Sequence, residues 1–166
     1  DLPAQPTRAA RHQSLRAAIG SSLEALSVAE RETFARISVF GGFFDSSAAE
    51  QIAGQAAVTA LPALAREALI QVHRREGRLG YRLLRTMREF AADELRRQGD
   101  EAAIRRRHRQ RYADRWEAAS HTDELLDDVT EHYADALDAL ASALDDHDGA
   151  AQAIIAIALA RWWAFT

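Results

Sequence analysis

The stretch from Tyr81 to Leu95 constrains the fold most, because a strand-like segment turns into an amphipathic helix there without a glycine or proline between them. The helical part repeats its apolar residues at the 3.6-residue period of a buried face. These residues are Met87, Phe90, Ala91 and Leu95. We expect Thr86 to cap this helix, with Glu89 completing a capping box. The sequence therefore predicts that a hairpin strand leads directly into a core helix.

The residues before this stretch predict three or four short helices. Leu15, Ile19, Leu23 and Leu26 mark one face of a first helix, and the motif at residues 27–30 is a capping box that starts the second. The second helix buries its aromatic residues and stops at Gly41-Gly42, where glycine tolerates left-handed geometry. Asp45, Ser46 or Ser47 caps a third helix that Gly54 ends. A fourth begins near Thr59, with Pro62 in its first turn.

A hairpin follows these helices. Residues 70–73 alternate as a strand, residues 75–80 form the loop, and residues 81–84 return. Short helices followed by one hairpin are typical of winged-helix architecture. We therefore predict a mainly α fold whose winged-helix domain covers residues 11–98, after a linker at residues 1–10 that contains Pro3 and Pro6.

Residues 99–166 predict stacked helices. Gly99-Asp100 breaks the chain, and a long helix then buries a face formed by Ile104, His108, Tyr112, Trp116 and Ala119. Its other face carries Arg105, Arg106, Arg107, Arg109 and Arg111, and we expect this face to be solvated. From residue 123 the pattern stays helical, with a break at residues 145–149. Two antiparallel helices joined by a short polar turn form one TPR-like unit, so we expect this part to begin a TPR-like array.

Composition excludes several classes of site. The chain has 166 residues and no cysteine, which rules out disulfides and thiolate metal ligands. Its net charge is −4, but residues 1–115 carry 20 arginines against 14 acids, whereas residues 116–166 carry one arginine against 11. This split indicates two units, or a contact between oppositely charged faces. The longest apolar run, residues 153–160, is about half a membrane span. We expect a cytoplasmic protein with no membrane partner.

The order of the sequence blocks resembles a known bacterial family. The blocks are R-H-x-x-L-R-A-A-I from Arg11, then L-S-x-A-E-R, S-V-F-x-G-x-F, a wing ending Y-R-L-L, and T-x-R-E-[FY]-A. In this order they look like the arm that follows the nucleotide-binding module in STAND-type regulators, large multidomain ATPases of the AfsR and LuxR kinds. The resemblance covers residues 11–116 well and the last third more loosely. It implies a winged helix followed by a TPR-like superhelical region.

The resemblance also implies where chemistry lies. The chain has no lysine and no glycine-rich loop to hold phosphate. We therefore expect no enzyme activity and no cofactor within this chain, and an upstream ATPase module that binds ATP or ADP in the full-length protein. Some relatives carry a Met-His-Asp motif that senses nucleotide at the position of Leu83-Leu84-Arg85. Leu84 occupies the histidine position here, and Arg85 replaces a glutamate found in many AfsR-like arms. Arg85 is thus a candidate interdomain or nucleotide-proximal residue.

The expected function is that of a non-catalytic regulatory arm, which couples nucleotide state to effector output through protein contacts. Its partners would be the upstream module, downstream helical repeats and a protein or small-molecule inducer. Trp162, Trp163 and Phe165 are the candidate interface residues.

Two alternatives stay open, a DNA-binding winged helix and a free-standing helical adaptor. For DNA, the candidate phosphate contacts are Arg66, Arg74, Arg75, Arg78 and Arg82. The candidate recognition helix, TALPALAREAL, has no Asn, Gln or Lys to read bases, which weighs against DNA binding through this chain.

The histidines do not predict a metal site. The chain has six, at positions 12, 73, 108, 121, 132 and 147, and no two are three or four residues apart. We expect each of them, His108 included, to be a partly exposed surface residue.

Overall fold

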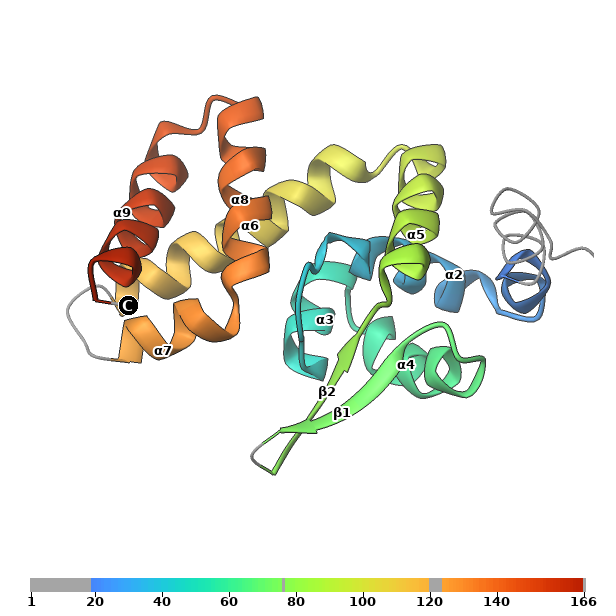
Figure 1. The fold of residues 1–166 in the computed structure, drawn as a ribbon. Helices are drawn as coiled ribbons and strands as arrows, with labels where there is room; N and C mark the ends of the chain where they lie inside the picture. Colours follow the sequence, from blue (N-terminus) through green and yellow to red (C-terminus); the bar gives the residue numbers. More distant parts are fainter. Residues whose placement is uncertain (1–18, 76, 120–123, 166) are drawn as a thin grey trace, which may run out of the picture.

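The computed structural model describes residues 19–75, 77–119 and 124–165. Within these residues the protein is mainly helical and contains one two-stranded antiparallel sheet (Figure 1). The elements in the first half are α2 (Val28–Arg36), the 3₁₀ turn η1 (Ile37–Val39), α3 (Ser46–Ala53), α4 (Ala56–Arg66), β1 (Gln71–Arg75), β2 (Arg78–Arg82) and α5 (Arg85–Gln98). Those in the second half are α6 (Glu101–Ala118), α7 (Glu124–Glu131), α8 (Tyr133–Asp145) and α9 (Gly149–Phe165). None of these helices combines the length and the apolar character that crossing a membrane requires.

Two hydrophobic clusters form the interior. The first cluster joins α2, α3, α4, α5 and the hairpin around Phe34, Phe40 and Phe44. The second cluster joins α6 to α9 and is rich in alanine. Helix α6 belongs to both, because Ile104 near its start packs in the first cluster and Trp116 near its end packs in the second. Figure 1 shows this helix running from one helical group to the other.

The N-terminal caps of α2 and α3 follow the local sequence. The Ser27 backbone N–H donates to Glu30 Oε2 at 2.7 Å, and the Glu30 N–H donates to Ser27 Oγ at 3.3 Å, so the predicted capping box is confirmed. The Asp45 carboxylate accepts from the Ala48 N–H at 2.8 Å and caps α3. Gly54, with φ of +95°, ends α3 as expected.

The capping box predicted for α5 is wrong. Helix α5 begins at Arg85, with extended Leu84 at the N-cap position and no side-chain cap. Thr86 therefore lies inside the first turn. The reason is a competing ion pair, since Glu89 accepts from Arg85 Nε at 3.0 Å, one helical turn away. The strand-to-helix transition itself lies where the sequence predicted it.

The glycine pair after α2 has a different role from the predicted one. Helix α2 ends at Arg36 and tightens into η1, so it stops before Gly41. Positive φ values among the described glycines occur at residues 54, 77 and 99, and not here. A Cβ on Gly41 would lie 2.9 Å from Asp138 Oδ2 and 3.1 Å from Ala134 Cβ. Gly41 is therefore required for close approach to α8.

Helix α4 and the hairpin extend further than predicted. Helix α4 starts at Ala56, three residues before Thr59, so Pro62 lies in its second turn. Strand β1 pairs with β2 from Gln71↔Arg82 to Arg75↔Arg78, so both strands reach into the segment 75–80 that was predicted as loop. A further bridge joins Phe44 to Tyr81 and attaches the hairpin to the first cluster.

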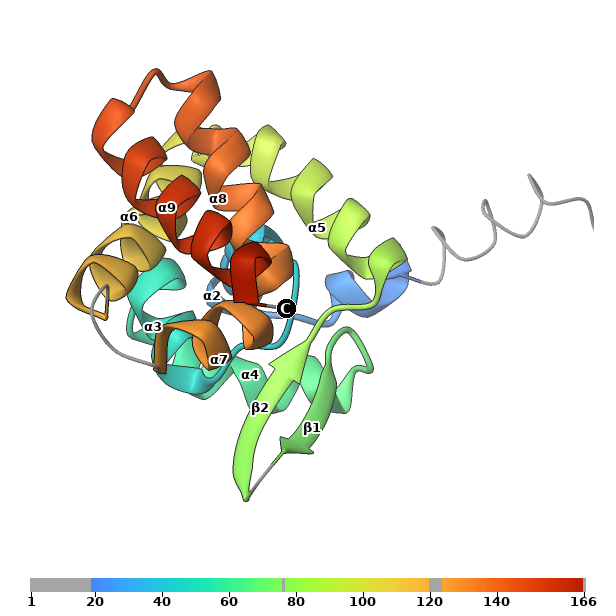
Figure 2. The same ribbon diagram turned by 60° about the vertical axis from the view of Figure 1, so that its left-hand side comes forward.

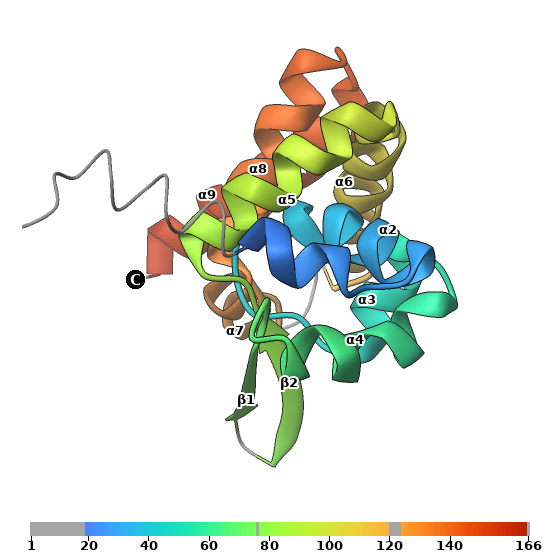
Figure 3. The ribbon, with the colours of Figure 1, turned by 90° about the vertical axis from the view of Figure 1, so that its right-hand side faces the viewer.

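The second half is a group of packed helices. Helices α8 and α9 lie side by side and are joined by a short turn, while α6 packs against both (Figures 1 and 2). Their shared interior is rich in small residues, among them Ala136, Ala139, Ala143, Ala151 and Ala158. In Figure 3 the hairpin projects from the opposite end of the molecule to the turn between α8 and α9.

Candidate functional site

The junction between the two clusters contains a fully buried carboxylate. Asp135 of α8 is 0% exposed. Its Oδ1 accepts a hydrogen bond from the Gly41 N–H at 2.8 Å and lies 3.0 Å from Nε2 of buried His108 on α6. Its Oδ2 has no hydrogen-bond partner among the described residues. One side chain thus connects α8, α6 and the loop after η1.

Close packing around Asp135 also depends on the second glycine of the pair. A Cβ on Gly42 would lie 3.0 Å from Asp135 Oδ2. Gly41 and Gly42 together therefore allow the loop to lie directly against the first turns of α8. A carboxylate near the start of a helix is also favoured by the helix dipole.

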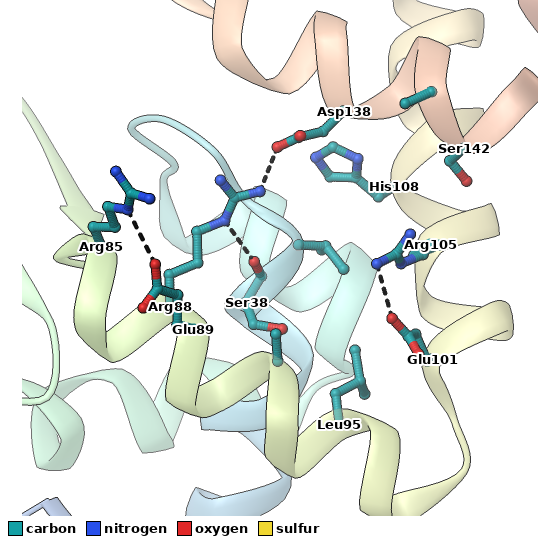
Figure 4. A pocket seen from close by; sticks show the side chains of 13 residues that line it. Ser38, Arg85, Arg88, Glu89, Leu95, Glu101, Arg105, His108, Asp138 and Ser142 are labelled. Atoms are coloured by element: carbon teal, nitrogen blue, oxygen red, sulfur yellow. Dashed lines mark hydrogen bonds and ion pairs between the residues drawn. The ribbon is translucent and has the colours of Figure 1, made fainter. Parts of the chain in front are cut away.

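A second polar connection at the junction involves Arg88 of α5. Its Nε donates to the Ser38 carbonyl oxygen at 2.9 Å, and its NH2 forms an ion pair with Asp138 of α8 (Figure 4). The guanidinium is held on one side by the first cluster and on the other by the second. Because Arg88 and Asp138 are both partly buried, screening by solvent is reduced compared with a surface pair.

Helix α6 forms further contacts with the first cluster. Arg107 NH1 donates to the Ile52 carbonyl oxygen at 3.4 Å, and Arg111 donates to Gln51, both on α3. Just before α6, Asp100 accepts from Arg36 of α2 at 3.0 Å. Arginine side chains predicted as one solvated face of α6 therefore cover α3 in part.

A cavity of about 390 Å³ lies between α5, α6, α8 and η1. Figure 4 shows arginines and acids from α5, α6 and α8 around it. Its lining residues are Ser38, Val39, Arg85, Arg88, Glu89, Ala92, Leu95, Glu101, Arg105, His108, Asp138, Ala141 and Ser142. Elements of both clusters therefore form its walls, and one lining residue, His108, is the residue that contacts Asp135.

The position of Arg109 differs from the prediction. It was expected on the solvated face of α6 but is buried. Its Nε donates to Asp148 Oδ2 at 3.0 Å, and its NH1 donates to Asp146 Oδ2 at 2.8 Å and to the Ser142 carbonyl oxygen at 3.0 Å. The hydrogen bond from Arg109 lowers the pKa of Asp146. The acidic turn between α8 and α9 is therefore fixed to α6.

A third polar group lies at the far end of α6. Asp128 of α7 accepts from Trp116 Nε1 at 2.7 Å and pairs with Arg115. Burial acts to raise the pKa of Asp128, but the Arg115 and Trp116 hydrogen bonds outweigh it, so the pKa is lowered. Burial lowers the pKa of His132, against the opposing effect of Asp128. Burial raises the pKa of Tyr112, with the charge of Asp135 acting in the same direction.

Four of the predicted arginine positions lie on the hairpin, and the other two lie on α4 and α5. Arg85 is at the rim of the cavity, with its side chain 91% exposed. Arg74 and Arg82 are exposed on the hairpin, and Arg75 is at the end of β1. Arg78 pairs with Asp45 at 3.4 Å. Arg66 pairs with its neighbour Glu67 at the end of α4.

The aromatic residues at the end of α9 divide into two groups. Trp162 packs on Tyr133, with ring centroids 4.8 Å apart, and donates from Nε1 to Thr130 Oγ1 at 2.7 Å. Trp163 and Phe165 are 60% and 73% exposed.

The prediction that each histidine is partly exposed is wrong for His108, which is 2% exposed. His132 is partly buried and therefore also partly exposed. His12 and His121 lie outside the described residues. The helical period of α6 places His108 on the same face as Ile104 and Tyr112, and this was the available sequence signal that His108 is buried. Among the described residues, no group of three or more His, Asp or Glu could hold a metal ion.

Comparison with known proteins gives a partial alignment. The chain is 32% identical over 104 residues to uncharacterized proteins of Mycobacterium tuberculosis and Mycobacterium bovis. The alignment covers 58% of this chain but 26% of each relative, so the chain spans about a quarter of their length. No protein-family model and no solved structure matches the chain.

Proposed function

We propose that this chain is a non-catalytic regulatory arm of a STAND-type ATPase transcriptional regulator. In this proposal residues 11–98 form a winged-helix domain and residues 99–166 begin a TPR-like helical array. The hairpin that leads through Leu84 into α5, and the antiparallel pair α8 and α9, support the two assignments. The arm transmits nucleotide state from an upstream module to effector output.

The polar junction is the observation that carries the proposal. A buried carboxylate is costly unless it is paired and hydrogen-bonded. Asp135 is held by groups from both clusters, and Arg88 adds a second connection through Ser38 and Asp138. Such contacts depend on geometry more strongly than apolar packing does, so they favour one relative position of the two units. A rigid relation between units is what an arm needs in order to transmit a movement.

Exposed side chains indicate how the arm would contact its partners. Arg85 at the start of α5 is available to an upstream nucleotide-binding module. Trp163 and Phe165 on α9 offer apolar surface to downstream helical repeats or a protein inducer. These partners follow from the family resemblance and from the exposure of the residues.

The test uses the full-length polypeptide. Its upstream sequence should encode a phosphate-binding loop, and Asp135→Ala or Arg88→Ala should change its ATP hydrolysis rate or effector output at least about threefold. Arg106→Gln, an exposed change on α6, is the matched control. A polypeptide without a phosphate-binding loop, or variants with wild-type hydrolysis and output, would contradict the proposal. The absence of a phosphate-binding loop from the full-length polypeptide would favour a free-standing adaptor.

DNA binding is the second candidate, favoured by the exposed hairpin arginines Arg74 and Arg82. The exposed face of α4, however, presents Val58, Thr59 and Pro62, and its last residue, Arg66, pairs with Glu67. These side chains offer few of the donors and acceptors that read bases in the major groove. A duplex-binding assay over a salt series decides between DNA binding and the regulatory role, because phosphate contacts make the affinity for DNA fall steeply with salt. Tight, salt-dependent binding lost in Arg74→Gln would favour DNA binding.

A further inference from the structure

From the cavity at the junction, we infer a binding site for a small organic anion, with a carboxylate or phosphate head and an apolar body. The cavity has a volume of about 390 Å³, which lies in the range of small-molecule pockets. Such pockets form preferentially where two structural units meet. This inference goes beyond the regulatory role, because the site can bind a ligand whether or not the chain is part of an ATPase.

The lining separates into an apolar part and a charged part. Val39, Ala92, Leu95 and Ala141 supply apolar surface from η1, α5 and α8. The charged residues are Arg85, Arg88 and Glu89 on α5, Glu101 and Arg105 on α6, and Asp138 on α8. Figure 4 shows the three guanidinium groups spread across the cavity from α5 to α6. A ligand with one charged end and one apolar end matches this division.

Arg88 is the positioned donor of the site. Its Nε and NH2 are occupied by the Ser38 carbonyl and by Asp138, which fix the plane of the guanidinium. A guanidinium carries five N–H donors, and NH1 of Arg88 has no hydrogen-bond partner among the described residues. It can bind an oxyanion while both existing contacts remain.

The other two arginines also retain donors. Arg85 contacts Glu89 through Nε at 3.0 Å, and Arg105 contacts Glu101 through NH2 at 2.8 Å. Both are pairs within one helix, the Arg85 pair largely exposed and the Arg105 pair partly exposed, so each stabilises the protein only slightly and is easily rearranged. Guanidinium groups bind carboxylate and phosphate in bidentate geometry. A cationic ligand, in contrast, would have to share carboxylates that each already bind an arginine.

Binding would be tested on the 166-residue chain by calorimetric titration with hexanoate and hexyl phosphate. We expect saturable one-to-one binding of at least one of them. Arg85→Gln/Arg105→Gln should weaken it about tenfold, the loss expected for one hydrogen bond to a charged group. Ala141→Leu, which adds volume at an exposed position on the cavity wall, should weaken it through the apolar part. Arg106→Gln, the same charge change on α6 outside the lining, should bind as wild type.

Thermal melts of each variant establish that it is folded, and Arg85, Arg105 and Ala141 are sufficiently exposed to tolerate the changes. Hexanol and hexylammonium test the charge preference. Comparison of hexanoate with hexyl phosphate distinguishes the two kinds of head. The inference is overturned if neither anion binds saturably at millimolar concentration, if hexylammonium binds as tightly as hexanoate, or if the double variant retains wild-type affinity.

Discussion

At the scale of single residues, the junction depends on partners that are distant in sequence. His108 and Asp135 are 27 positions apart, and Gly41 and Asp135 are 94 apart. The helical period of α6 placed His108 on a buried face, but no local signal identified Asp135 as the hydrogen-bond partner of the buried His108 ring. The same limit explains Arg109, since its acceptors lie on the turn after α8. Helical periodicity indicates which face is buried and leaves the polar partners undetermined.

Asp135→Ala should lower the free energy of unfolding by about 3 kcal/mol, because one buried and one partly buried donor lose their acceptor. Those donors are the Gly41 N–H and His108. Asp135→Asn, which retains an acceptor oxygen, should cost less than half as much. Denaturant titration measures both. Equal losses for the two variants would show that the charge, and not hydrogen bonding, is the contribution that matters.

His132 should make stability depend on pH. Its pKa is lowered by burial from the ordinary 6.5, so the unfolded chain binds more protons than the folded chain just below that pH. Stability should therefore fall as pH decreases through 6.5 toward the lower folded pKa. His132→Gln should flatten this slope, and His73→Gln, on the exposed hairpin, should not. Denaturant midpoints between about pH 7.5 and 5 provide the measurement. An unchanged slope in His132→Gln would contradict the assignment.

At the scale of elements, sequence patterns located helices better than they located helix ends. Ser27 caps α2 as predicted, and Asp45, one of the three candidates, caps α3, because each cap needs only residues within the same turn. Thr86 does not, because Arg85 competes for Glu89. The face of α5 was also identified, with Leu95 buried and with Met87 and Phe90 partly buried against the first cluster. The predicted helix ends were wrong where alternative caps or ion pairs of the same residues have similar energies.

The burial of Leu95 leads to a prediction for α5. Leu95→Ala should cost about 3 kcal/mol, since it leaves a void in a packed interior. Phe90→Ala should cost less, because Phe90 retains contact with solvent. Thermal melts of the two variants check the order. A larger loss for Phe90→Ala would mean that this helix packs with a different face inward.

Helix α9 presents apolar side chains on nearly every face. Ala151, Ile155 and Leu159 are buried in the second cluster, while Ile157 and Trp163 are exposed. A helix that is apolar all round is normally buried on all sides. We therefore expect this chain to self-associate through α9, and Ile157→Glu to reduce the association at least about tenfold. Sedimentation beside a form extended by about forty residues tests whether a further repeat covers the face. Two monomeric forms would contradict the prediction.

At the scale of the whole molecule, the charge split seen in the sequence corresponds to contacts within the chain. Arg88 of the basic part pairs with Asp138 of the acidic part, and Arg115 pairs with Asp128. One of the two interpretations offered by the split, a contact between oppositely charged faces, is thus observed. The cavity could not be predicted, because its lining comes from four elements whose packing no local pattern specifies.

The junction should make the two clusters unfold together. All three tryptophans, at positions 116, 162 and 163, lie in α6 and α9, so their fluorescence reports the second cluster, whereas far-UV circular dichroism reports helices of both. For the wild-type chain we expect the two probes to give one coincident denaturant transition, the signature of two-state unfolding.

Asp135→Ala/Arg88→Ala removes both polar connections and leaves α6 as the main link between the clusters. In that variant the two transitions should separate, with the fluorescence midpoint displaced from the dichroism midpoint. Arg106→Gln, a charge change at an exposed position of α6 outside the cavity lining, should keep them coincident. Coincident transitions in the junction variant would mean that apolar packing along α6 couples the clusters. The polar contacts could not then be what fixes the relative position of the two units, and the regulatory proposal would lose its carrying observation.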